Sequence, residues 1–312
     1  MNDLLQVGSE ALKKIALDEN AKDFILNNKP VYQVLRKAAD RYIGGETLEE
    51  TVSKVLKSNQ DDYKCSIEFM GENTSTEKEA NDATQEFIRI AETIRGKQLN
   101  ATISLDLSHI GLAISPALCL HNLELLCNAA KQDIEIIISA EGVNQTDTII
   151  ETYKKASPVF SNLSITLQAY LYRTKDDFQE LLKEDGRIRI VKGAFHTPEG
   201  LSMPRGKELD ETYLYYIDQL LMEGHKCSIA THHFEIQQQA KKLIDYYNPD
   251  RHYYEFESLY GIQTEQLAKL KEEGYVTKLY FVYGYEWYLY LCNRIAEYPL
   301  NLFLALQDIS KQ

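Results

Sequence analysis

Residues 188–194, Ile-Arg-Ile-Val-Lys-Gly-Ala, form a short β-branched run that ends in a basic residue and a glycine. Such a run predicts a strand, and the Lys-Gly pair predicts a turn into a loop. The same form recurs along the chain, at residues 65–69, 101–105, 134–138, 163–167, 227–230, 253–256 and 278–282. The sequence therefore predicts eight strands within about 220 residues, each ending in a loop.

Helical periodicity fills the intervals between these strands, at residues 76–95, 116–131, 145–157, 174–184, 208–223, 234–247 and 263–274. The regular alternation of strand and helix predicts an α/β fold, a (β/α)8 barrel. A doubly wound open sheet is the alternative, but no G-x-G-x-x-G follows a strand.

The first part of the chain reads as helices, and Thr47 with Glu50 predicts a capping box at the start of one of them. We therefore expect an N-terminal helical arm over residues 1–60 and a barrel over residues 61–312, as one domain overall.

The composition limits the function. The chain has 312 residues and a net charge of −13, which argues against binding to nucleic acid or to anionic membranes. Its five cysteines are widely spaced without a C-x-x-C pair, as suits a reducing cytoplasm. No apolar stretch is long enough to span a membrane, and the N-terminus does not resemble a secretory signal. We expect a cytoplasmic protein.

The C-terminal ends of the strands form the active site in a barrel of this kind. Every expected strand end carries a polar group, and several also carry a glycine that allows close approach of a ligand to the backbone. In chain order, polar residues at these ends are Glu72, Asp106, Ser139, Gln168, Lys192, Thr231, Glu257 and Tyr285. The sequence therefore predicts a polar pocket at one end of the barrel.

Two local patterns have competing interpretations. Lys192-Gly193-Ala194 is either an ordinary turn or a phosphate site made of a lysine and free backbone N–H groups. In the expected helix over residues 288–297, Tyr290, Arg294 and Glu297 fall on one face by helical spacing. The pair of charges is either a weak surface contact or part of a pocket wall.

A metal site is a further alternative. His232-His233 with Glu141 or Glu255 offers metal-ligand side chains, but adjacent strand residues point to opposite faces. A metal-dependent barrel hydrolase would use His109, Asp106, His232 and Glu255. No metal-ligand spacing supports it, so we expect no metal.

Over nearly its whole length the chain resembles the proline dehydrogenase family, FAD-dependent enzymes that oxidise L-proline to pyrroline-5-carboxylate. The segments that carry the resemblance include RYIGGETLEE, FMGENTSTEKEA, ISLDLSHIGLAIS, ITLQAYLYR, RIRIVKGAF, IATHHFEI, YYEFESLYGI, YFVYGYEWYLY and NRIAEYPLN. The resemblance implies a distorted (βα)8 barrel with N-terminal helices. It also implies a final helix over the barrel mouth that supplies substrate ligands.

The resemblance implies that the flavin side of the site is kept. The matching positions are Ala140, Gln168, Arg189, Val191, Lys192, Gly193, Ala194, Thr231, His232 and Glu257, where the family has Gln at the last. Arg189 and Lys192 can offset the charge of flavin and pyrophosphate, and a cation near the reduced flavin favours hydride acceptance.

The substrate side departs from the family pattern at three positions. The family motif Y-x-x-R-R-x-x-E is Tyr290, Asn293, Arg294 and Glu297 here, so that Asn replaces the first of two arginines that grip the proline carboxylate. Asp106 stands where the family has Lys, and Ser139 where it has Asp. Further substrate positions implied by the resemblance are Tyr280 and Leu259.

These replacements shift the pocket charge by −2, since Lys to Asp contributes −2, Arg to Asn −1 and Asp to Ser +1. We therefore expect hydride transfer to flavin N5 from a cyclic or secondary amine that carries an extra cation, or whose carboxylate is masked or absent, more than from L-proline itself. The implied catalytic residues are Arg189, Ser139, Asp106 and Glu72, with Asp106 or Glu72 taking the ammonium proton.

Two expectations concern partners and activity. The resemblance implies that a quinone or another acceptor reoxidises the flavin, and a quinone would bring the protein to the inner face of the membrane as a peripheral partner. The alternative to an enzyme is a degenerate relative that binds flavin and has a regulatory role without turning proline over. Reduction of the flavin by any amine discriminates between the two.

Overall fold

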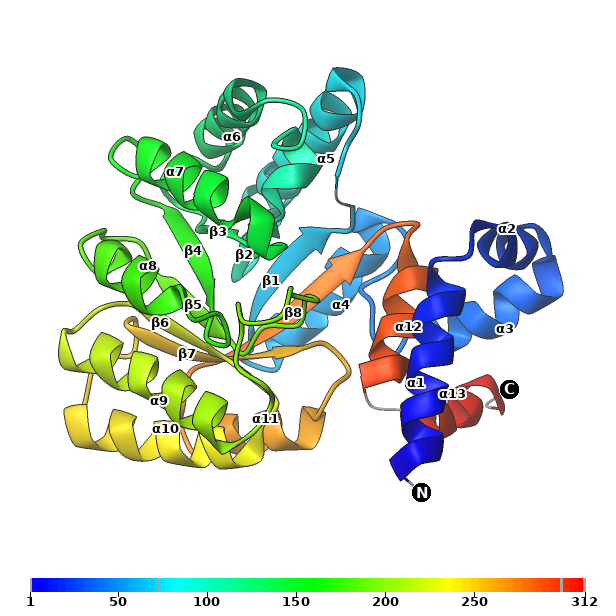
Figure 1. Cartoon of the computed structure of the whole chain (residues 1–312). Coiled ribbons are helices and arrows are strands. Elements are labelled where there is room, and N and C mark those ends of the chain that lie inside the picture. Colours follow the sequence, from blue (N-terminus) through cyan, green and yellow to red (C-terminus); the bar gives the residue numbers. More distant parts are fainter. Residues whose placement is uncertain (1, 72, 298–299, 311–312) are drawn as a thin grey trace.

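A closed barrel of eight parallel strands forms the centre of the computed structural model, which describes residues 2–71, 73–297 and 300–310 (Figure 1). The strands are β1 (Lys64–Phe69), β2 (Ala101–Leu105), β3 (Ile136–Ile138), β4 (Leu163–Gln168), β5 (Ile188–Val191), β6 (Cys227–Ala230), β7 (Tyr254–Leu259) and β8 (Thr277–Tyr283). Each strand pairs with the next, and β1 pairs with β8 to close the ring. The predicted barrel is confirmed. Two strand limits differ from the prediction by more than one residue: β3 begins only at Ile136, and β7 continues to Leu259.

Helices surround the barrel, one before β1 and the others after successive strands. They are α4 (Leu48–Gln60), α5 (Glu77–Lys97), α6 (Pro116–Ala130), α7 (Thr146–Ala156), α8 (Thr174–Leu181), α9 (Lys207–Met222), α10 (Phe234–Tyr247) and α11 (Thr264–Glu272), with short 3-10 turns η1 (Leu107–Ile110) and η2 (Val143–Gln145). Their starts follow from local sequence. Thr76 and Glu79 form a complete capping box at α5, and Ser115 caps α6 ahead of Pro116.

The predicted capping box at α4 forms only in part. The Thr47 hydroxyl accepts the Glu50 N–H at 3.3 Å. The Glu50 carboxylate, however, accepts the N–H of Glu46 at 2.9 Å and pairs with Arg36 at 2.9 Å. In a complete box the Glu50 carboxylate would accept the Thr47 N–H. Here the carboxylate binds Glu46 N–H and Arg36 instead.

The strands present an apolar face outward and a polar face inward. Ile67, Ile103 and Phe256 are completely buried in the main apolar core, which lies between the strands and the surrounding helices. The intervening positions carry Ser, Thr, Arg, Glu and Lys side chains that meet one another across the barrel, as described below. The period of two that places side chains on alternate faces thus separates an apolar core from a polar interior.

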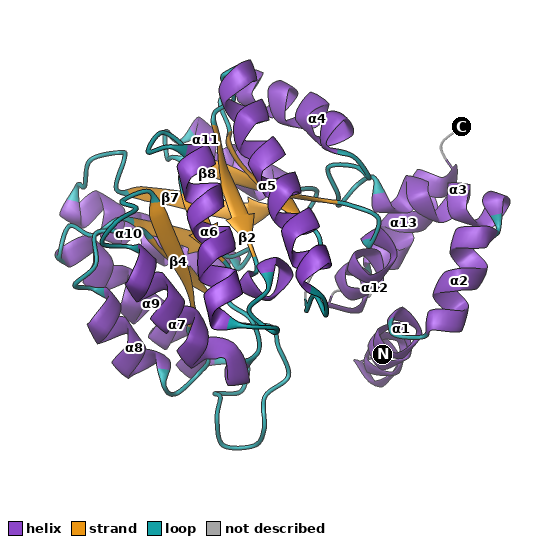
Figure 2. Cartoon of the chain, turned by 90° about the horizontal axis from the view of Figure 1, so that it is seen from above, coloured by secondary structure: helices purple, strands orange, loops and turns teal. Residues whose placement is uncertain are grey.

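A second group of helices forms a lobe beside β1 and β8 (Figures 1 and 2). It comprises α1 (Asn2–Ala16), α2 (Glu19–Asn27), α3 (Lys29–Ala39), α12 (Trp287–Glu297) and α13 (Asn301–Ser310). Its own apolar cluster includes Tyr42, Ile43 and Trp287, together with Val282 from β8. Because α12 follows β8 closely, its start lies at the C-terminal edge of the barrel, where the site was expected.

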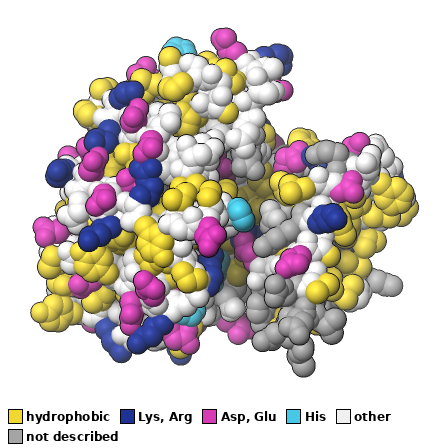
Figure 3. Space-filling model, in the orientation of Figure 1, with side chains coloured by type: hydrophobic (Ala, Val, Ile, Leu, Met, Phe, Trp, Pro, Cys, Tyr) yellow, Lys and Arg dark blue, Asp and Glu magenta, His cyan; other side chains and the backbone are white. Residues whose placement is uncertain are grey.

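The surface carries charges of both signs. Figure 3 shows them interspersed over the barrel, with hydrophobic side chains gathered at the outer edge of the helical lobe. Among the described residues, no helix is long and apolar enough to cross a membrane.

Candidate active site

Arg189 of β5 joins side chains from both sides of the barrel interior. Its Nε donates to Thr166 Oγ1 at 2.8 Å, and its Nη2 donates to Ser139 Oγ at 3.1 Å. Its Nη1 donates to Ser104 Oγ at 3.0 Å and lies 3.0 Å from Glu257 Oε1. Because the partners come from β2, β4, β7 and the end of β3, Arg189 is fixed inside the barrel. It is 4% exposed, so its charge is held by the protein rather than by water.

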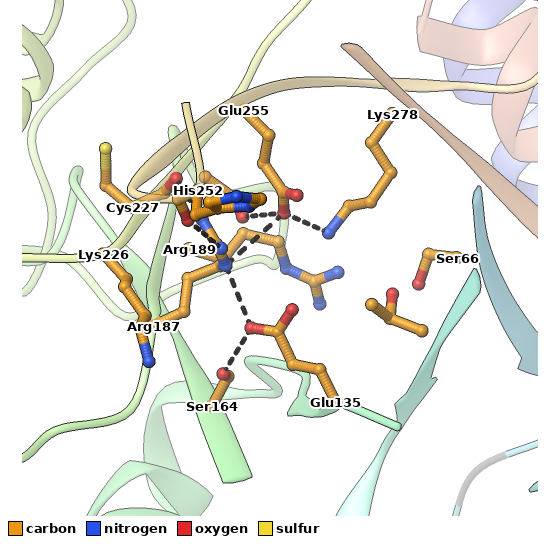
Figure 4. A network of polar contacts seen from close by, with 12 residues as sticks. Ser66, Glu135, Ser164, Arg187, Arg189, Lys226, Cys227, His252, Glu255 and Lys278 are labelled. Carbon is orange, nitrogen blue, oxygen red and sulfur yellow. Dashed lines mark hydrogen bonds and ion pairs between the residues drawn. The ribbon is translucent and has the colours of Figure 1, made fainter. Parts of the chain in front are cut away.

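The floor of the barrel is a network of ion pairs between buried and partly buried side chains. Figure 4 shows Arg187 and Lys278 converging on Glu255, with Glu135 reaching Arg187 from another direction. Glu255 pairs with Lys278 and, at 2.8 Å, with Lys64, while Glu135 lies 2.9 Å from Arg187 Nε. Burial opposes ionisation here, but Arg187 and Lys64 lower the pKa of Glu135 to about 2. The charged side chains of this layer pair with one another. The layer closes the barrel below Arg189 and its partners Ser104, Ser139, Thr166 and Glu257, which together with the neighbouring Glu68 are called the Arg189 group.

Glu68 of β1 lies in the same interior but in a different electrostatic state. Its Oε2 accepts a long hydrogen bond from Ser139 Oγ at 3.4 Å. Burial raises the pKa of Glu68 to about 7, against the lowering effect of Arg189. The neighbouring carboxylates of Glu141 and Glu257 add to the increase in pKa. Glu68 is therefore a carboxyl group that changes protonation near neutral pH.

The loop after β5 combines two cations with a constrained glycine. Gly193 has φ +105°, and a Cβ there would lie 2.1 Å from the Tyr170 ring. The carbonyl of Gly193 accepts a hydrogen bond from Arg205 at 2.5 Å. Lys192 pairs with Asp210 and is partly buried. The loop thus holds Lys192 and Arg205 next to a backbone that is free of side chain, at the C-terminal end of the strand.

The end of β6 supplies a hydroxyl and a neutral histidine. Thr231 Oγ1 accepts the N–H of His233 at 3.1 Å. The N–H of Leu259 donates to His232 Nε2 at 3.0 Å, which assigns the ring proton to Nδ1. Burial lowers the pKa of His232 to about 4, with a further contribution from Arg294. His232 is therefore a neutral donor at physiological pH.

The face of α12 that the sequence singled out comes together as its spacing predicts. Arg294 Nη2 lies 2.5 Å from Glu297 Oε1, and its guanidinium lies over the Tyr290 ring at 5.0 Å from the centroid. Burial raises the pKa of Tyr290 to about 12, and its hydroxyl has no hydrogen-bond partner among the described residues. Asn293 is partly buried beside them. Within the barrel, Tyr280 stacks its ring against the Arg189 guanidinium at 5.2 Å.

The remaining expected residues lie at the same end of the barrel or outside the described residues. Glu72 falls outside the described residues. Asp106 precedes η1 and is partly buried, as are Ala140 and Val191, whereas Ala194 is exposed. Gln168 Nε2 donates to the carbonyl of Glu141 at 2.9 Å, which fixes the amide at the end of β4.

The ligands of the alternative metal site are not gathered. His109 stacks on Phe69 at 5.1 Å between ring centroids, and burial lowers the pKa of His109 to about 4. Glu255 belongs to the ion network of the floor, and His232 uses Nε2 to accept a backbone N–H. Within the described ranges no three His, Cys, Asp or Glu side chains cluster as metal ligands.

Sequence reasoning missed the interior residues. Two of them, Ser104 and Thr166, accept hydrogen bonds from Arg189. Lys278 pairs with Glu257, and Glu68 accepts a hydrogen bond from Ser139. All four lie within strands, whereas the prediction considered the residues at the strand ends, which line only the mouth of the barrel. The signal was the alternation itself, since Cys65-Ser66-Ile67-Glu68-Phe69 places Glu68 among the inward positions.

Comparison with known proteins gives consistent relatives. The family model described as proline dehydrogenase matches residues 51–298. Proline dehydrogenase 1 of Bacillus subtilis (strain 168) is 32% identical over 278 residues, which cover 89% of this chain and 92% of that protein. Proline dehydrogenase of Deinococcus radiodurans is 27% identical over 285 residues, with 89% and 92% covered.

Solved structures share the fold at lower identity. Proline utilization A (PutA) from Bdellovibrio bacteriovorus, inactivated by N-propargylglycine, superposes with a TM-score of 0.77 at 16% identity over 88% of this chain. PutA from Corynebacterium freiburgense gives a TM-score of 0.71 at 17% identity over 94% of it. This chain spans only 36% and 35% of those longer chains, so the likeness concerns the barrel and its helices.

Proposed function

Because this chain belongs to the proline dehydrogenase family, a family of oxidoreductases, we propose that it oxidises a cyclic or secondary amine with FAD as the acceptor. The observation that carries the proposal is the Arg189 group: a buried cation held under the barrel mouth by residues of four other strands or strand ends. The substrate is a small amine related to L-proline, of the kind that the altered pocket residues favour.

The donor set at the mouth fits a flavin dinucleotide. Lys192 and Arg205 flank the bare backbone of Gly193, which is the chemistry that a pyrophosphate requires. Thr231 and the neutral His232 offer a hydroxyl and a ring N–H at the next strand end. Arg189 lies deeper and would offset negative charge on the flavin ring. When bound, FAD supplies the acceptor for the hydride that leaves the C–H bond next to nitrogen.

The residues on the substrate side favour an amine over an amino acid with a free carboxylate. Asn293 stands where the family has the first of two arginines, and the remaining Arg294 already pairs with Glu297. Losing one desolvated Arg–carboxylate contact costs about 2–5 kcal/mol, or about 30- to several-thousand-fold in binding. Asp106 and Glu68 add acidic groups at the mouth and in the interior, which favour a cationic substrate.

The chain's residues would act on the substrate by position and charge. Tyr280 and Tyr290 would wall an amine ring, since each presents an aromatic face beside a guanidinium. Arg294 would orient a polar substituent of the substrate. A quinone or another acceptor would reoxidise the flavin, and contact with a quinone would make the protein peripheral at the inner face of a membrane.

Anaerobic flavin reduction tests the proposal. The purified protein with FAD is mixed with L-proline, prolinamide, L-proline methyl ester, pyrrolidine and 3-aminopyrrolidine, and the loss of visible flavin absorbance is followed. We expect bleaching, with a higher kcat/KM for the amide, the ester or the dicationic amine than for L-proline. A preference for L-proline over all the others would contradict the substrate assignment, and a protein that binds no FAD would contradict the cofactor assignment.

An arginine at position 293 provides the matched variant. We expect Asn293→Arg to raise kcat/KM for L-proline by about tenfold or more, because it restores a second guanidinium for the carboxylate. Gln307→Arg adds the same charge on the exposed side of α13 and serves as the control. A yellow protein that no amine bleaches, in either variant, would favour the alternative of a flavin-binding relative without turnover, to which the three pocket replacements point.

A further inference from the structure

Glu68 is the more exposed of the two glutamates that face Arg189, and it lies one residue before the C-terminal end of β1. Arg189 and Glu257 are each only 4% exposed, whereas Glu68 is partly exposed. Its carboxylate is positioned by Ser139, whose hydroxyl lies 3.4 Å away and also accepts a hydrogen bond from Arg189. Glu68 is therefore held by an interior hydrogen bond, is partly exposed, and lies near the strand end at which we expect the substrate to bind.

The charge of Glu68 is not neutralised by a neighbouring cation. Arg189 forms its ion pair with Glu257, at 3.0 Å. Among the described residues no Lys or Arg lies within ion-pair distance of Glu68. The charged or titratable groups that face it are Arg189 of β5, Glu141 after β3, Glu257 of β7 and Tyr290 of α12. A carboxylate in this position lacks a permanent partner and gains one when an ammonium or a proton arrives.

We propose that Glu68 is the residue that accepts the ammonium proton of the amine substrate, an assignment that rests on the proposed function and deepens it. In this step one N–H bond of the ammonium breaks and one O–H bond forms on the Glu68 carboxylate. The electron pair of the broken bond remains on nitrogen as its lone pair. The neutral amine can then release the neighbouring C–H as hydride, and the proton leaves Glu68 through the mouth to water.

The titration of the surrounding groups agrees with this role. The pKa of Glu68 is raised to about 7, chiefly by burial, which suits a base at neutral pH. Burial lowers the pKa of His232 to about 4 and raises the pKa of Tyr290 to about 12. A transition near pH 7 in substrate reduction would therefore belong to Glu68 rather than to His232 or Tyr290.

The experiment compares Glu68→Gln with the unchanged protein in anaerobic flavin reduction at saturating amine from pH 5.5 to 9. The amine is the fastest of the panel above whose own pKa exceeds 9. In the unchanged protein we expect the rate constant to rise with pH through an apparent pKa near 7. In Glu68→Gln we expect that transition to vanish and the rate at pH 8 to fall about 100-fold or more. Binding of inert 1,1-dimethylpyrrolidinium, which has no N–H proton, should remain within tenfold in calorimetry.

Controls separate this inference from the proposed function. Glu273→Gln removes a carboxylate from a Lys241 ion pair on the outside of the barrel and should leave the profile unchanged. If Glu68→Gln does not fold, Glu68→Asp replaces it, and we expect the transition to persist with a rate at least tenfold lower. A transition and rate unchanged in Glu68→Gln or in Glu68→Asp would overturn this inference alone. Failure of every amine to bleach the unchanged protein would overturn both this inference and the proposed function.

Discussion

Glu257 and Glu68 both face Arg189 inside the barrel, but only Glu257 forms an ion pair with it. Glu257 also lies 2.7 Å from Lys278, so its charge is shared between two cations. Glu68 has Ser139 as a hydrogen-bond donor and two acidic neighbours, and its pKa rises to about 7, with burial as the main cause. The same residue type in one chamber thus occurs once in ion pairs with two cations and once without such a pair among the described residues, and burial raises the pKa of the second.

The raised pKa of Glu68 has a consequence for folding stability. Between its ordinary pKa of 4.5 and about 7, the folded protein binds a proton that the unfolded chain has released. Stability therefore falls as pH rises through this window, and the cost is complete above pH 7. Glutamine cannot ionise. We therefore compare the unfolding free energy of Glu68→Gln with that of the unchanged protein at two pH values. We expect this difference to favour the variant by about 1–2 kcal/mol more at pH 8 than at pH 4.5, a value that allows for the partial exposure of Glu68.

Urea unfolding of both proteins without flavin, at pH 4.5 and at pH 8, measures this difference. Glu273→Gln is the control, since it removes a partly exposed carboxylate, and its difference from the unchanged protein should vary little between the two pH values. An equal effect of Glu68→Gln at both pH values would show that folding does not raise the pKa of Glu68.

The loop after β5 holds both cations and the constrained glycine of the expected cofactor site. We expect Gly193→Ala to destabilise the protein by about 2–4 kcal/mol, for two reasons. The backbone at φ +105° is strained for a residue with a side chain, and the added Cβ would lie 2.1 Å from the Tyr170 ring. Gly200→Ala is the matched control: its φ is +83°, but no atom lies within 4 Å of the added Cβ. It should cost about 1–2 kcal/mol from the backbone alone.

Unfolding free energies and FAD titration of both glycine variants test this difference. We expect Gly193→Ala, but not Gly200→Ala, to weaken FAD binding by about tenfold or more, because Lys192 and Arg205 are held on either side of Gly193. Equal losses of stability and an unchanged FAD affinity would remove the loop from the cofactor site.

Elements with local signals were predictable, and contacts across the barrel were not. The strands follow from runs such as Ile188–Val191, and the mouth follows from the rule that parallel strands end together. The Arg189 group depends instead on pairs such as Ser104 and Glu257, which lie 85 and 68 residues from Arg189 along the chain. The barrel's closure and register bring them together, and no local pattern in the sequence encodes that distance.

The described residues pack into two apolar cores, one around the barrel and one in the helical lobe. The lobe joins distant parts of the chain: Lys22 pairs with Glu286 at 2.8 Å, and Arg41 pairs with Asp308 at 2.5 Å. Trp287, at the start of α12, is completely buried there and donates to Glu46 at 2.7 Å. The N-terminal helices therefore help to fix the helix that carries Tyr290 and Arg294.

The barrel floor governs how the whole molecule responds to acid. Glu135 accepts hydrogen bonds from Arg187 at 2.9 Å and from Ser164 at 2.7 Å, and its pKa is lowered to about 2 although burial opposes ionisation. A carboxyl whose pKa is lowered on folding stabilises the protein fully above its ordinary pKa, 4.5 here, and this contribution is lost as pH falls through about 2.

We expect Glu135→Gln to cost about 2–5 kcal/mol at pH 7, because the buried Arg187 and the partly buried Lys64 lose a charged partner, and we expect the deficit to shrink between pH 4.5 and pH 2. Glu180→Gln is the matched control, because it breaks a Lys154 ion pair at the surface, with Glu180 59% exposed, and should cost less than about 1 kcal/mol. Denaturant unfolding across this pH range measures both. A deficit of Glu135→Gln that stays constant down to pH 2 would mean that its neutral amide, rather than a lost charge, disturbs the floor. A cost equal to that of Glu180→Gln would mean that Lys64 and Arg187 are satisfied by Glu255 alone, and that the floor tolerates the loss of one of its two carboxylates.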